Sequence, residues 1–111
     1  MMKSFVHALQ GGKVVLRERN FQLHILAAIL ILLLGYVVGI SHLEFTILLL
    51  TIGVVWSAEA FNTAIEILCN RVTSEYDSQI KIIKDVSAFA VLIVAMVALV
   101  IGVMIFWPYL D

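Results

Sequence analysis

Three long runs of apolar residues limit the folds that this sequence can adopt. The first covers residues 23–40, the second starts at Phe45, and the third ends near Trp107. Each is long enough to cross the hydrocarbon core of a bilayer as a helix. Of the 111 residues, 63% are hydrophobic and 14% are charged, which is far too apolar for a water-soluble domain of this size. Because backbone groups in lipid must find partners within the chain, the sequence predicts an all-α membrane protein.

We expect one integral-membrane domain over residues 1–111, with transmembrane helices at residues 23–40, 45–70 and 78–107. Residues 41–44 are predicted to form a turn that is short enough only for an antiparallel helical hairpin. Asp77 or Ser78 is the expected cap of the third span. Three spans enclose little interior, so inward-facing polar side chains would need partner subunits, and we expect an oligomer.

Residues 1–20 combine basic and apolar side chains. The apolar residues recur at near-helical spacing, with an interruption expected at Gly11 and Gly12. This pattern favours an amphipathic helix on the membrane surface. Charges run directly up to the first apolar run without a small-residue cleavage pattern, so we expect no cleaved leader.

The basic residues are distributed unevenly along the chain. All seven lysines and arginines lie before the first span or between Arg71 and Lys84. The positive-inside rule therefore predicts a cytoplasmic N-terminus, a cytoplasmic 71–84 connection and an external C-terminus. The single cysteine, Cys69, excludes an internal disulfide and is expected to be a packing residue.

Four polar residues interrupt the second apolar run. At 100° per residue Glu59, Asn62, Glu66 and Asn70 fall at roughly 0, 300, 340 and 20°, so they share one narrow helical stripe. Ionisable residues in a membrane helix usually mark a functional site. The alternative is that the stripe only joins helices by hydrogen bonds. Two carboxylates on one stripe fit that alternative poorly.

The chemistry of these side chains points to phosphoryl transfer. Mg²⁺ is commonly held by one or two carboxylates plus substrate phosphates, and Glu18 and Glu66 are the natural pair at the boundary of the first two spans. Glu59, one turn deeper, is the candidate general base. Lys84 could neutralise charge on a transferring phosphoryl group. No P-loop or protein-kinase motif is present.

Two further side chains near these spans have less defined roles. His24 is expected to be an interfacial polar side chain rather than a ligand, because histidine tolerates a half-wet boundary well. Trp56 is either an interface anchor or a packing residue.

Three segments carry a resemblance to a known family. Residues 59–66 (Glu-Ala-Phe-Asn-Thr-Ala-Ile-Glu), 74–76 (Ser-Glu-Tyr) and 84–88 (Lys-Asp-Val-Ser-Ala) resemble the signature of the small prokaryotic diacylglycerol kinases and undecaprenol kinases. Residues 3–8 and 18–24 look most like the undecaprenol kinase branch. The resemblance implies a homotrimer in the bacterial inner (cytoplasmic) membrane. Each subunit would have a surface helix and three spans, and active sites would form between neighbouring subunits.

The resemblance also implies a role for individual residues. Glu59 would act as the base on the lipid hydroxyl, Glu18 and Glu66 would hold the Mg²⁺ of MgATP, and Asn62 would position the reacting groups. The residues implied to contact ATP are Lys84 and Asp85, together with the loop residues Glu75, Tyr76 and Asp77.

One position departs from the family pattern. Where the family reads Glu, three residues, then Asp, this chain has Glu66 followed by Asn70. The Asn70 amide can form a hydrogen bond but carries no charge. Metal or nucleotide binding would therefore be weaker than in the family, or the phosphoryl donor or the acceptor lipid would differ.

Three functional hypotheses remain at this point. The leading one is an ATP-dependent lipid kinase acting on undecaprenol or diacylglycerol, between which the apolar spans do not decide. The second is a channel or transporter subunit with a carboxylate-lined cation site. The third, motivated by Asn70, is a degenerate, non-catalytic family member.

Overall fold

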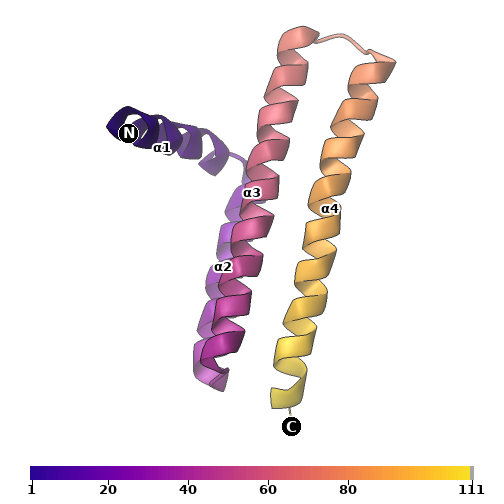
Figure 1. Cartoon of the computed structure of the whole chain (residues 1–111). Coiled ribbons are helices and arrows are strands. Elements are labelled where there is room, and N and C mark those ends of the chain that lie inside the picture. Colours follow the sequence, from indigo (N-terminus) through magenta and orange to yellow (C-terminus); the bar gives the residue numbers. More distant parts are fainter. Residues whose placement is uncertain (111) are drawn as a thin grey trace.

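All regular secondary structure in residues 1–110, the residues that this computed structural model describes, is helical. The helices are α1 (Met2–Leu16), α2 (Arg19–Val38), α3 (His42–Val72) and α4 (Ser78–Phe106), followed by the short 3₁₀ turn η1 (Trp107–Tyr109). Figure 1 shows α2, α3 and α4 running lengthwise beside one another, with α1 projecting sideways. The helices α2 and α3 and the segment Ser78–Tyr109 are long and apolar enough to cross a membrane. The predicted all-α membrane architecture is thus confirmed.

A tight turn joins α2 to α3. Gly39 adopts a left-handed conformation, with φ at 85°, and the backbone N–H groups of Gly39 and Ile40 both donate to the carbonyl of Gly35, at 2.9 and 3.1 Å. Ser41 and Glu44 then form a capping box, with distances of 3.1 and 2.9 Å. Because this box starts the helix, residues 42–44 are helical, and the prediction that they form the turn was wrong.

The packed centre of the chain is small and lies near this turn. Ile40, Leu48 and Ile105 form its buried cluster, and Phe45 and Phe106 pack against them. No large side chain among residues 1–110 is completely buried. The three spans therefore leave most of their apolar surface without a partner from the same chain.

Hydrogen bonds fix both ends of α4. At its start, Asp77 accepts from the backbone N–H groups of Gln79 and Ile80, at 2.9 and 3.1 Å, so the predicted cap is confirmed for Asp77. At its far end, the Tyr109 hydroxyl donates to Glu44 Oε1 over 2.6 Å. This bond holds the end of the chain against the start of α3.

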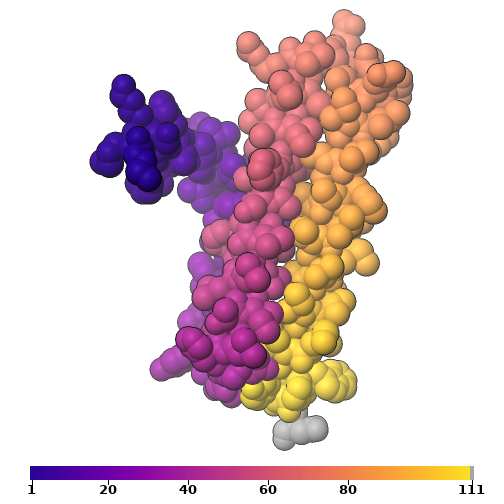
Figure 2. Space-filling view, viewed as in Figure 1, coloured from indigo at the N-terminus to yellow at the C-terminus, as the bar shows by residue number. Residues whose placement is uncertain are grey.

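The N-terminal helix differs in two ways from the prediction. It runs without interruption through Gly11 and Gly12, where the backbone needs no left-handed conformation. It also ends at Leu16, because the backbone N–H groups of Arg17 and Glu18 close its last turn, and α2 starts at Arg19. No residue of α1 is buried, and Figure 2 shows it standing away from the body of the molecule.

The left-handed conformation at Gly39 gives a first test. A side chain at this φ costs roughly 1–2 kcal/mol, whereas asparagine tolerates the left-handed region better. No atom lies within 4 Å of a Cβ added there, so the cost is conformational. Gly39→Ala is therefore expected to lower the free energy of unfolding in detergent micelles, and Gly39→Asn to lower it less. Equal stability of Gly39→Ala and the unmodified chain would contradict the role of the turn.

Candidate active site

The polar stripe of α3 is shared between two neighbouring helices. Glu59 contacts α2, while Asn62 and Asn70 contact α4. Glu66, between them in sequence, is exposed. The polar stripe thus contacts both α2 and α4 near the same end of the molecule. The Glu66 carboxylate makes no hydrogen bond or ion pair within residues 1–110.

Glu59 is buried and lies against a histidine of α2. Its Oε1 atom is 3.0 Å from His24 Nε2, and the Glu59 side chain is 9% exposed against 31% for His24. No other side chain among residues 1–110 forms an ion pair or a hydrogen bond with this carboxylate. The expectation that His24 is an interfacial side chain did not include this contact, which arises because the register of the α2–α3 hairpin places His24 beside Glu59.

An aromatic contact accompanies this pair. The rings of Phe21 and Trp56 have centroids 5.6 Å apart, and each lies one turn from His24 or Glu59 on the same helix. Such pairs add stability beyond the apolar area that they bury. Trp56 is thus a packing residue between α2 and α3.

On its other side, α3 bonds to α4 through Asn62. The Ser87 hydroxyl donates to Asn62 Oδ1 over 2.7 Å, and Ser87 is buried while Asn62 is half-buried. The side-chain oxygen of Asn62 is thereby fixed, and its NH₂ group remains able to donate to a ligand. Ser87 belongs to the 84–88 signature segment, but its bond to Asn62 was not predicted from the sequence.

Further along the same interface, the Lys84 ammonium donates to Asn70 Oδ1 over 2.7 Å. The residue that departs from the family pattern thus contacts a residue implied to bind the nucleotide. Asp85 forms an exposed ion pair with Lys81 at 2.7 Å, one turn earlier on α4. Because its partner is a neutral amide, the charge of Lys84 has no carboxylate partner among residues 1–110.

The two predicted metal ligands, Glu18 and Glu66, lie at similar heights, Glu18 directly before the start of α2 and Glu66 on the antiparallel α3. At 1.5 Å per residue they are about 9 and 10 Å beyond the His24–Glu59 contact, measured along α2 and α3. Both are exposed, and neither side chain makes a hydrogen bond or ion pair with residues 1–110. The described chain contains no group of three or more metal-ligating side chains.

The remaining predicted nucleotide contacts belong to the loop between α3 and α4. Glu75, Tyr76 and Asp77 are all exposed there. The backbone N–H of Glu75 donates to Thr73 Oγ1 at 3.1 Å, and the Asp77 carboxylate caps α4. Within residues 1–110, no hydrogen bond or ion pair joins these loop side chains to Glu59, Asn62 or Glu66.

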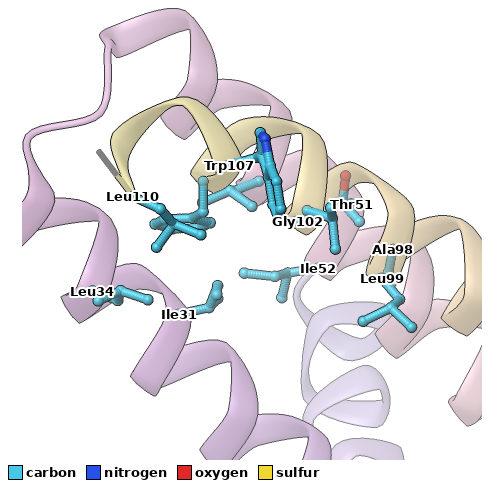
Figure 3. A pocket seen from close by; sticks show the side chains of 12 residues that line it. Ile31, Leu34, Thr51, Ile52, Ala98, Leu99, Gly102, Trp107 and Leu110 are labelled. Carbon is cyan, nitrogen blue, oxygen red and sulfur yellow. The ribbon is translucent and has the colours of Figure 1, made fainter.

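Open apolar cavities lie along the helices, one near Glu59 and another towards the opposite end of the spans. One, of about 800 Å³, lies between α1, α2 and α3 and includes Phe21, Trp56 and Thr63 in its lining. Another, of about 550 Å³, runs between α2, α3 and α4 towards η1 and is shown in Figure 3. Thr51 is the one polar side chain in its lining. These surfaces suit apolar chains.

The comparisons with known proteins decide the class of this site. The sequence matches the prokaryotic diacylglycerol kinase family over residues 6–106. The chain belongs to this family. A curated relative, the undecaprenol kinase of Bacillus subtilis (strain 168), is 41% identical over 109 residues, covering 97% of this chain and 89% of the relative. This family member is therefore an ATP-dependent lipid kinase, and the alternatives of a channel subunit and a non-catalytic member are not favoured.

The buried Asn62–Ser87 bond in this kinase can be tested by its effect on stability. Ser87→Ala leaves Asn62 Oδ1 without its donor in a half-buried position, so the free energy of unfolding should fall by roughly 1–3 kcal/mol. The matched control is Ser57→Ala, because Ser57 is exposed on α3 and its side chain makes no hydrogen bond within residues 1–110. Equal unfolding midpoints for the two variants would show that the bond contributes nothing.

Proposed function

We propose that this lipid kinase transfers the γ-phosphoryl group of ATP to the hydroxyl of undecaprenol. The observation that carries the proposal is the buried Glu59 carboxylate, which lies 3.0 Å from His24 on a membrane-length helix. Burying a carboxylate in a membrane helix costs free energy, so its presence there usually marks a functional site. The 41% identical relative, an undecaprenol kinase, supports this acceptor. Diacylglycerol is the second candidate, because the matching family is named for its phosphorylation.

The donor set fits the Mg²⁺ that such a reaction uses. Glu18 and Glu66 are exposed carboxylates that make no side-chain hydrogen bond or ion pair in the described chain, and they lie at similar heights, Glu18 directly before α2 and Glu66 on α3. Mg²⁺ needs only one or two protein carboxylates when substrate phosphates supply further oxygen ligands. Glu18 and Glu66 would therefore hold the metal, which would neutralise charge on the ATP phosphates.

The transfer itself follows from the placement of Glu59 and Asn62. Glu59 accepts the proton of the lipid hydroxyl as the hydroxyl oxygen bonds to the γ-phosphorus. The bond from that phosphorus to the bridging oxygen breaks, and ADP leaves. The Asn62 NH₂ group, oriented by the bond from Ser87, donates to a reacting oxygen. Glu59 is then a protonated acid that must lose its proton before the next cycle.

Residues beyond α3 would bind the nucleotide. The Lys84 ammonium lies at the α3–α4 interface and stabilises negative charge on the phosphates. Asp85 and the loop residues Glu75, Tyr76 and Asp77 contact the remainder of ATP. Asn70 keeps Lys84 near the site through a neutral hydrogen bond.

The assembly we propose is a homotrimer with sites shared between subunits. It is supported by the small interior of a single chain, in which no large side chain of residues 1–110 is completely buried. Amphipathic α1 lies on the cytoplasmic membrane surface, and the 71–84 connection is also cytoplasmic. The charge distribution of the sequence supports this orientation.

Phosphate transfer tests the proposed function directly. We expect γ-labelled ATP to label undecaprenol in mixed micelles, and Glu59→Gln to reduce labelling to a small residual rate while assembly and nucleotide binding persist, because the amide cannot accept the proton. Diacylglycerol is offered in parallel. The matched control is Glu44→Gln, because Glu44 lies in the first turn of α3, far from Glu59 along the helix. Full activity of Glu59→Gln would exclude Glu59 as the base, and labelling of diacylglycerol alone would reassign the acceptor.

Titration with Mg²⁺ tests the carboxylate pair separately. In Glu66→Gln the Mg²⁺ concentration at half-maximal activity is expected to rise, on the order of tenfold or more, because one anionic ligand is lost. Glu18→Gln should act in the same direction, and Glu44→Gln should leave the titration unchanged. A Glu66→Gln titration that matches the unmodified enzyme would refute the ligand role.

A further inference from the structure

The contact between α2 and the buried carboxylate assigns a role to a residue outside the predicted site. We propose that His24 is the positioning residue of Glu59, holding its carboxylate through Nε2 in the orientation needed for proton transfer from the lipid hydroxyl. This inference rests on the proposed function of Glu59 as the base.

The geometry leaves one carboxylate oxygen for substrate. His24 Nε2 lies 3.0 Å from Oε1, and no other side chain of the described residues forms an ion pair or a hydrogen bond with the carboxylate. Every fully buried side-chain oxygen among residues 1–110 has a hydrogen-bond partner. Oε2 of Glu59 has no such partner, so this oxygen is not fully buried. A carboxylate fixed through one oxygen and open at the other can accept a proton along a defined direction.

The imidazole is well suited to this task. When Nε2 carries a hydrogen, in the neutral ring or in the imidazolium, it is a donor group 3.0 Å from Oε1. The ring comes from α2, so it does not move with rotations of the Glu59 backbone on α3. The neighbouring Phe21–Trp56 contact fixes the spacing of the two helices, with ring centroids 5.6 Å apart.

The competing explanation is that His24 only joins α2 to α3. A joining contact would affect stability and assembly, whereas a positioning contact affects turnover through Glu59. The two explanations therefore differ in which kinetic constant changes and in whether the effect of His24 survives the loss of Glu59.

The experiment compares His24→Leu and His24→Gln in the assembled enzyme in mixed micelles. His24→Leu removes the polar group, and we expect kcat to fall roughly 10²-fold with KM for MgATP little changed. His24→Gln retains an N–H donor on a side chain of similar reach, so it should recover a large part of kcat. The matched control is His42→Gln, since His42 is an exposed histidine at the start of α3, far along the chain from Glu59.

Residual turnover in the double variant separates positioning from joining. If His24 acts through Glu59, then His24→Leu combined with Glu59→Gln is no slower than Glu59→Gln alone. The proposal is overturned if His24→Leu keeps kcat within about threefold of the unmodified enzyme, a change too small for proton-transfer catalysis. It is also overturned if the two losses multiply, or if His24→Gln is as slow as His24→Leu in correctly assembled enzyme. Failure of the proposed function has a different sign: the Glu59→Gln variant, in which His24 is unchanged, would then be fully active.

Discussion

The cost of placing a carboxylate inside a membrane helix governs the arrangement of this chain. Glu59 lies in α3 with its side chain 9% exposed, and its partner His24 belongs to a different helix. A lone carboxylate at that depth would destabilise the span, so α2 has to lie against this face of α3 at this height. The short turn at Gly39 then fixes the register that makes the contact.

Each helix beside α3 meets a different part of the polar stripe. Towards α2 the stripe presents the acidic Glu59, and towards α4 it presents the amides Asn62 and Asn70. The proposed base, Glu59, and the proposed phosphate-binding residue, Lys84, are thereby held by separate helix pairs. This division suits a reaction in which one substrate is a lipid and the other is dissolved in water.

The sequence predicted those features that depend on local periodicity. Apolar run lengths gave the three spans, and the 3.6-residue repeat placed Glu59 and Asn62 on one stripe. The partnership of His24 was missed because it depends on the register of two helices, which becomes visible only when residues are counted from the turn at Gly39. The early start of α3 was missed because Ser41 and Glu44 cap the helix from within a segment that resembles a polar turn.

The length of α3 has a consequence for the way this enzyme sits in lipid. Its 31 residues span about 46 Å, while the hydrocarbon core needs only about 30 Å. The helix therefore has room to slide or tilt when bilayer thickness changes. Because His24 and Glu59 lie in contact across two helices that share one turn, such hydrophobic mismatch displaces the proposed base and its imidazole together. The depth of the reaction can thus vary with the membrane, while its internal geometry is conserved.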